Sequence, residues 1–169
     1  GKERIKDLVR NPLRLTLLCS TWHLRDGELP DTRAELYEQF INDLYDWKSE
    51  LFPTTKTNRK NLNQKLGELA KKAIDSELTR FRLRHDLVCS ILGQPGAEGS
   101  MLDLALSLGW LNAVGIDPDN PRKPVYAFFH ATFQEYFAAK TINSWNFFLP
   151  SSDGDIKLKS EHQEVEEPY

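Results

Sequence analysis

A histidine placed immediately before an expected helix is the residue of this sequence best suited to chemistry. His130 closes the alternating run 125–130 and precedes Thr132 and Glu135, whose T-x-x-E spacing predicts a helix start. Backbone N–H groups at a helix N-terminus attract anions, and a histidine there adds a donor of tunable charge. The arrangement suits contact with a phosphate or carboxylate. A purely structural histidine is the alternative, and the residue pattern taken alone favours it.

Two elements must position His130. The alternation over 125–130, with apolar residues on both faces, predicts a short strand that is covered on both sides and ends at His130. Phe133, Tyr136 and Phe137 follow at the i, i+3, i+4 spacing of a helix. One face of that helix is therefore expected to be a dense aromatic surface that packs into a groove.

Composition sets limits on the class of protein. The chain has 169 residues, of which 40% are hydrophobic, and this is enough for one domain or two small ones with a buried core. A net charge of −3 gives no general reason to bind nucleic acid. No apolar run reaches the ~20 residues of a membrane span. Cys19 and Cys89 lie inside apolar runs without a C-x-x-C partner, which predicts buried free thiols and a cytoplasmic location.

The first third of the chain is expected to be helical. Ile5, Leu8 and Val9 have helical spacing at the very start, which suggests a piece of something longer. Asn11 and Pro12 predict the start of a second helix, whose apolar residues to about Leu24 predict burial on most sides. A T-x-x-E box at 32–35 predicts the start of a third helix, which reaches 51. The polar run 53–60 that follows predicts a boundary between two lobes.

The remainder of the chain changes character. In order, the pattern predicts a helix to about 76, a short strand at 80–84, helices at 87–92 and 101–108, and a hairpin with strands at 110–114 and 125–130 joined by a long proline-rich tip. This is the order of a winged helix, a helix-turn-helix variant whose hairpin is the wing. The predicted fold is therefore mainly α, with a helical subdomain followed by a winged-helix subdomain.

An enzyme needs a constellation of residues that this sequence does not contain. It has no G-x-x-x-x-G-K-[ST], G-x-G-x-x-G after a strand, H-E-x-x-H or G-x-S-x-G. Cys19 and His23 have the spacing to share a metal, but no third ligand follows, so ordinary packing and a surface histidine are favoured. His85, beside Asp86, is expected to belong to a helix cap. No catalytic or metal-binding residue is predicted.

A winged helix raises the possibility of DNA binding through its third helix. The residues argue against it, because the expected third helix at 100–110 contains Asp103 and no lysine or arginine. The wing supplies Arg122 and Lys123. Three alternating arginines at 80–84 are interpreted as a solvated face, with an acidic partner surface as the functional alternative.

Three segments together carry a resemblance to a known family. They are N-P-L-x-L-x-L-L-C at 11–19, E-L-P-x-x-R-x-E-L-Y at 28–37 and F-H-x-x-F-Q-E-Y-F-A-A at 129–139. With them the chain, to about residue 145, resembles NACHT-family signal-transduction NTPases, the bacterial members more closely than the animal Nod-like receptors. The resemblance implies a helical subdomain at 1–58, a winged helix at 59–145 and an acidic tail or linker at 146–169. The ATPase core of such a protein would lie upstream.

The resemblance also implies two site residues. Pro12 matches the family's proline that packs against adenine, and His130 matches the winged-helix histidine that contacts the terminal phosphate of ADP in the resting state. It implies ATP or ADP with Mg in the full-length protein and no tightly bound nucleotide in this fragment. The implied partners are the upstream ATPase core, a downstream sensor and further copies on activation, in bacterial defence or stress response. The rival functions are a DNA-binding winged helix and a protein-interaction module without nucleotide contact.

Overall fold

The computed structural model describes residues 10–24, 30–76 and 80–142. The helix expected around 5–9 and the acidic segment 146–169 lie outside these residues. The elements, in chain order, are α2 (Pro12–Leu24), α3 (Arg33–Trp47), α4 (Lys56–Asp75), β1 (Leu83–Arg84), α5 (His85–Leu92), α6 (Met101–Leu108), β2 (Leu111–Ile116), β3 (Pro124–Phe128) and α7 (Ala131–Thr141). The predicted mainly helical fold with a small hairpin is confirmed for the described part of the chain.

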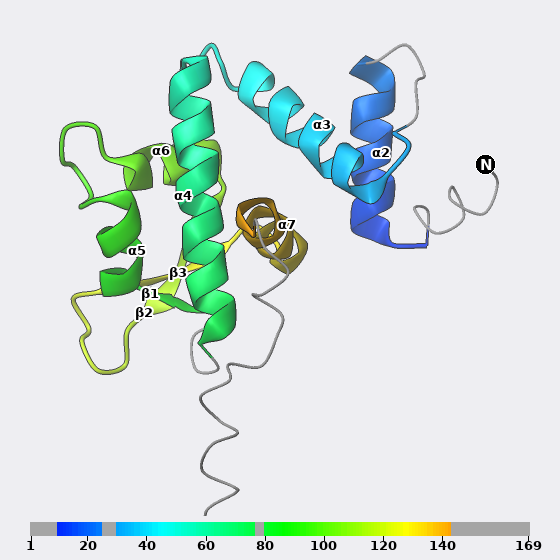
Figure 1. Cartoon of the computed structure of the whole chain (residues 1–169). Coiled ribbons are helices and arrows are strands. Elements are labelled where there is room, and N and C mark those ends of the chain that lie inside the picture. Colours follow the sequence, from blue (N-terminus) through cyan, green and yellow to red (C-terminus); the bar gives the residue numbers. More distant parts are fainter. Residues whose placement is uncertain (1–9, 25–29, 77–79, 143–169) are drawn as a thin grey trace, which may run out of the picture.

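The helices are arranged around α4 and α7. In Figure 1, α7 is seen end-on between α4 and α3, with α2 packed on the far side of α3. The helices α5 and α6 lie on the opposite side of α4. A glycine allows α4 and α7 to approach closely, because a Cβ at Gly67 would lie only 2.7 Å from the carbonyl oxygen of Phe137. These two helices form the centre of the molecule.

A three-stranded antiparallel sheet completes the fold. The strand order is β1-β3-β2, with Leu83 opposite Tyr126 and Leu111 opposite Phe128. The predicted strand at 80–84 is shorter than expected, since only its last two residues pair. The carbonyl of Arg80 accepts a hydrogen bond from the Gln134 side chain (2.6 Å), a contact outside the sheet. Strand β3 also ends two residues before His130, and Phe129 is exposed rather than covered.

One hydrophobic core joins the two predicted lobes. Trp110, almost fully buried, contacts the ring of Tyr45 from α3 and the rings of Phe133 and Phe137 from α7, with centroid distances of 5.5–6.1 Å. The polar run predicted as a boundary is mostly helix, because Thr55 caps α4 by accepting from the backbone N–H of Asn58 (3.1 Å). The connection is therefore short. The placing of a domain boundary at residue 58 remains a prediction.

The T-x-x-E box before α3 is confirmed. The hydroxyl of Thr32 accepts from the backbone N–H of Glu35 (3.1 Å), and the Glu35 carboxylate accepts from the N–H of Asp31 (2.8 Å). The helix ends at Trp47 rather than 51, and its C-cap residue Lys48 donates to the carbonyl of Leu108 at the end of α6 (2.8 Å). A cation on the last carbonyls of α6 also suits the negative end of that helix.

The predicted burial of α2 is wrong for much of its surface. Leu17 and Leu18 are buried, but Leu15 and Trp22 are 40% and 47% exposed. Cys19, expected to be buried, is exposed, whereas Cys89 is buried as predicted. The physical reason is that α3 covers one face of α2, while an apolar run carries no information about how many partners a helix has.

Tyr45 is expected to make the free energy of unfolding decrease at alkaline pH. Its hydroxyl donates to the Asn63 side chain (2.7 Å), and burial raises the pKa of Tyr45 to about 12 from 10.0, against smaller opposing effects of Trp110 and Arg59. Because the folded pKa is higher, the stabilisation of the neutral phenol is complete below pH 10 and is lost as the pH rises from about 10 to 12.

We therefore expect the free energy of unfolding to fall by on the order of 2 kcal/mol across this interval because of Tyr45. Urea unfolding at pH 9 and pH 12 measures the fall, and the Tyr45→Phe variant should show a smaller one. An equally steep decline in the variant would assign the effect to another group.

Candidate functional site

His130 is the N-cap of α7, which corrects the predicted cap at Thr132. Its backbone is extended (φ −153°, ψ 148°), and its carbonyl accepts from the N–H groups of Phe133 and Gln134 (3.0 and 3.3 Å). Its Nδ1 accepts from the backbone N–H of Thr132 (3.2 Å). The helix thus begins two residues earlier than predicted, because an imidazole nitrogen takes the role usually filled by a serine, threonine or aspartate oxygen.

The tautomer of His130 follows from this geometry. A backbone N–H can only donate, so Nδ1 must be the acceptor and the ring proton must lie on Nε2. The Thr132 hydroxyl lies 3.0 Å from the same Nδ1, which fixes the ring further. The side chain is exposed. His130 therefore presents one N–H donor outward, next to the positive end of a helix dipole.

The aromatic face of α7 fills a groove of its own chain. Phe133 and Phe137 are buried, while Tyr136 is half-buried. The Phe133 ring lies 5.2 Å from Tyr37 and 5.5 Å from Phe40, both on α3. The predicted aromatic surface is confirmed, and its partners are α3 and Trp110. The helix that carries His130 is thereby packed against α3 and Trp110.

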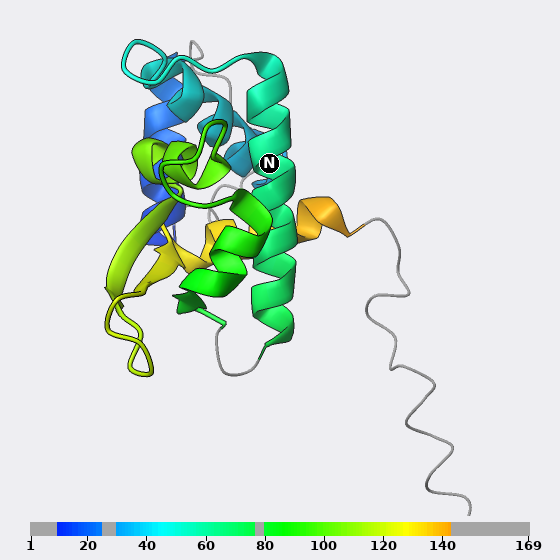
Figure 2. The ribbon, with the colours of Figure 1, turned by 90° about the vertical axis from the view of Figure 1, so that its left-hand side faces the viewer.

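Pro12 is the other predicted site residue, and it begins α2 as expected. The Asn11 carboxamide oxygen accepts from the backbone N–H groups of Leu13 and Arg14 (3.0 and 3.3 Å), so the predicted cap is confirmed. The Pro12 ring is exposed. In Figure 2 the dark-blue α2 lies at the left, and α7 begins, in yellow, nearer the middle of the molecule. Both predicted residues are therefore exposed, on helices that lie on opposite sides of α3 in Figure 1.

Arg84, of the three alternating arginines, and Lys123, of the two wing cations, are paired with acids of the same chain. Arg84 contacts Asp119 and lies 3.5 Å from Asp117, and Lys123 contacts Asp86 at 2.6 Å. The hydrogen bond from Lys123 lowers the pKa of Asp86, and the one to Asp119 raises the pKa of Arg84. These exposed pairs are worth little in stability, yet they reduce the positive charge that Arg84 and Lys123 could offer to a phosphate backbone.

Sequence reasoning missed a contact between His85 and Cys89. His85 was expected in the cap region at a helix start, and it is the first residue of α5, directly after the N-cap Arg84, which makes no capping side-chain bond. The His85 ring stacks on Tyr126, and its Nε2 lies 3.3 Å from the Cys89 sulfur. Burial raises the pKa of the Cys89 thiol, so the pair lacks the thiolate that nucleophilic chemistry requires. The i, i+4 spacing on a helix was the signal for this contact.

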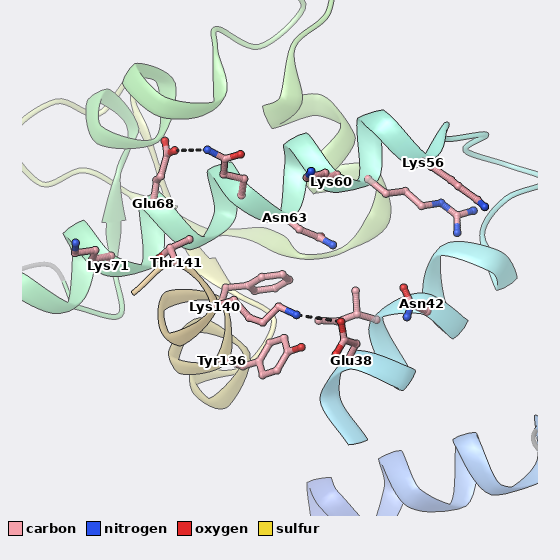
Figure 3. Close-up of a pocket in the computed structure, with 14 residues that line it drawn as sticks. Glu38, Asn42, Lys56, Lys60, Asn63, Glu68, Lys71, Tyr136, Lys140 and Thr141 are labelled. Carbon is pink, nitrogen blue, oxygen red and sulfur yellow. Dashed lines mark hydrogen bonds and ion pairs between the residues drawn. The ribbon is translucent and has the colours of Figure 1, made fainter. Parts of the chain in front are cut away.

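A groove of about 920 Å³ lies between α3, α4 and α7, and sequence reasoning also missed it (Figure 3). Its lining is rich in cations: Lys56, Arg59, Lys60, Lys71 and Lys140. Glu38 and Glu68 are the acids that line it. The spacing of Lys56, Arg59 and Lys60 on one face of α4 was a signal in the sequence, but the other two walls come from distant helices.

Comparisons with known proteins give no family for this chain. No protein-family model and no curated protein matches it. Within the described ranges, no cluster of three or more histidine, cysteine or acidic side chains has the arrangement of a metal site. None of the helices described combines the length and apolar character needed to cross a membrane.

Proposed function

We propose that this chain is the regulatory portion of a NACHT-family NTPase, which helps to hold ADP or ATP and couples the nucleotide state to oligomerisation and signalling. In this proposal residues 1–58 are the helical subdomain, 59–145 the winged helix and 146–169 a tail toward a downstream sensor. The nucleotide, with Mg, belongs to the full-length protein, whose upstream core supplies the phosphate loop. The setting is cytoplasmic, in bacterial defence or stress response.

The observation that carries the proposal is the state of His130. Its Nδ1 is occupied by the helix backbone, so its Nε2–H is fixed as an outward donor at the positive end of α7. A phosphate oxygen is the acceptor that such a site suits best. Pro12 is also exposed, and it offers a flat apolar ring of the kind that packs against a base.

The element order supports the winged-helix part of the proposal. Helix α4, strand β1, helices α5 and α6 and the β2–β3 hairpin follow one another, and β1 adds to the edge of the hairpin sheet. The loop from Asp117 to Lys123 is then the wing tip. Its Asp117 N–H donates to the Lys123 carbonyl (2.9 Å), which closes the loop.

Both rival functions have an observation against them. For DNA binding, α6 would enter the major groove, but it contains Asp103 and no cation, and the wing cation Lys123 is paired with Asp86. For a protein-interaction module that docks through its aromatic helix, the required side chains, Phe133 and Phe137, are already buried in the chain's own core. The nucleotide-switch role uses neither of these surfaces.

The test is the nucleotide content of the full-length protein that contains this chain. We expect His130→Leu to lower the amount of ADP that co-purifies and to bias the protein toward its active, oligomeric state, because a hydrogen bond to phosphate is lost. Such a bond to a charged group is worth about 1.5–3 kcal/mol, or roughly 10- to 100-fold in affinity.

Ser100→Ala is the matched control for this test. Ser100 caps α6 by accepting from the Asp103 N–H, so the variant loses a helix cap of the same subdomain without touching His130. Its ADP content should equal that of the wild type. Unchanged ADP content and signalling in His130→Leu would reduce His130 to a structural cap.

A further inference from the structure

The groove between α3, α4 and α7 has a charge opposite to that of the whole chain. The chain carries a net −3, yet five cationic side chains and two acidic ones line the groove. Arg59 is paired with Asp46 at 2.7 Å, and Lys140 with Glu38 at 3.0 Å. Lys56 and Lys60 are exposed and form no ion pair with any described residue. The groove therefore has uncompensated positive charge on its α4 wall.

The floor of the groove is apolar. Ile41 from α3 and Phe137 from α7 are buried, and the half-buried ring of Tyr136, 5.9 Å from Nζ of Lys140, lines the groove beside them. Figure 3 shows Tyr136 and Lys140 on α7 facing Glu38 on α3 across the opening. A ligand that combines several carboxylates with a few aliphatic side chains would complement this surface better than a small inorganic anion, which could use only the charges.

The chain itself contains such a ligand. From residue 151 onward it has six acids and two lysines, with Glu161, Glu164, Glu166 and Glu167 close together. Ile156, Leu158 and Val165 supply aliphatic groups in the same segment. The acids of this segment are opposite in charge to the lysines of the groove, and its aliphatic side chains match the apolar floor.

The acidic segment is also tethered to the groove. Lys140 and Thr141, the last residues of α7, line the groove, and the last described residue, Ile142, follows directly. Eighteen residues lie between Ile142 and Glu161, so the two can be at most about 65 Å apart, whereas the α4 wall from Lys56 to Lys71 is about 22 Å long. Such a tether gives an effective concentration on the order of millimolar.

We propose that the acidic segment 153–167 binds the groove between α3, α4 and α7 of the same chain. The carboxylates contact Lys56 and Lys60, and the aliphatic side chains cover the apolar floor. The contact is electrostatic and partly exposed, so it weakens as salt shortens the Debye length from about 8 Å at 0.15 M to about 3 Å at 1 M. It is independent of nucleotide.

Carbodiimide cross-linking of the full chain, followed by peptide mass spectrometry, tests the proposal. The reagent joins a lysine amine to a carboxylate only where the two are in contact. We expect cross-links within the monomer from Lys56 and Lys60 to acids of segment 153–167, lost at 1 M NaCl. The Lys123–Asp86 pair, 2.6 Å apart and outside the groove, is the internal positive control.

Two variants of α4 sharpen the result. Lys60→Glu should lower the yield of cross-links between Lys56 and the acidic segment by roughly tenfold, because an attraction becomes a repulsion. Lys72→Glu makes the same charge change at an exposed site that does not line the groove, and it should leave the yield unchanged. Both side chains are exposed, and a thermal melt confirms that each variant folds.

Other outcomes would overturn the proposal. Cross-links from the acidic segment that fall equally on Lys72 and Lys60 would mean non-specific attraction. Cross-links found between chains only, with a yield that rises with protein concentration, would assign the groove to a second copy. No cross-link to the segment while Lys123–Asp86 forms would show that the segment does not occupy the groove.

Discussion

Phe133→Ala is expected to lower the free energy of unfolding by about 3–5 kcal/mol, the usual cost of removing a buried phenylalanine ring. Phe133 is fully buried and its ring contacts those of Tyr37, Phe40 and Trp110. It thus joins α7 to α3 and to the residue before β2. Since small domains are stable by only about 5–15 kcal/mol, the loss is a large part of the total. Urea unfolding followed by circular dichroism measures it.

Phe129→Ala is the matched control, because the same ring is removed four residues away. Phe129 is 53% exposed, so the cost should be about 1 kcal/mol or less. The comparison also tests whether the two predicted lobes share one core. A second, separate unfolding transition in Phe133→Ala, with the first unchanged from the wild type, would show that α3 is stable without α7. Equal losses in the two variants would contradict the packing described.

Gly67→Ala is expected to destabilise the chain by about 3 kcal/mol, the upper part of the usual range for overpacking. Alanine is the better helix former by about 1 kcal/mol, so propensity alone predicts the opposite sign. Overpacking outweighs helix propensity here, because the added Cβ would overlap the Thr141 side chain and lie 2.7 Å from the carbonyl oxygen of Phe137. A backbone atom cannot move aside unless α7 shifts away from α4.

Asn61→Ala, in the same helix, is the control that measures the effect of helix propensity without a change in packing. Asn61 is exposed, so this variant should be unchanged or slightly more stable. Thermal unfolding of the two variants beside the wild type measures the difference. A Gly67→Ala protein as stable as Asn61→Ala would show that α4 and α7 are farther apart than described.

Local signals in the sequence were enough to predict most of the elements. Asn11 and Pro12 correctly gave the start of α2, and the Thr32–Glu35 box gave the start of α3. Both signals act through hydrogen bonds within one turn, so they do not depend on tertiary context. The hairpin was predicted for the same reason, since its alternation is local.

Features that depend on tertiary contacts could not be predicted in the same way. The start of α7 is a local exception: Thr132 and Glu135 have the spacing of a capping box, but the backbone at His130 is extended and its own side chain caps the helix first. The other differences arise from tertiary packing. The burial of α2 was overestimated, because hydrophobicity does not say how many helices pack on it. The groove needs three helices from separate parts of the chain, so its cations were visible only as a stripe on α4.

The central claim is that His130 contacts a nucleotide phosphate beyond its role as a helix cap, and His130→Asn separates the two roles. Asparagine caps helices well, so α7 should stay intact, while the Nε2–H of the longer imidazole is replaced by an amide N–H that ends closer to the backbone and falls short of the phosphate. Calorimetric titration of ADP into the full-length protein, with its upstream core, is the direct measurement. We predict a Kd raised roughly 10- to 100-fold with unchanged thermal stability of the nucleotide-free protein. A wild-type Kd in His130→Asn would contradict the claim.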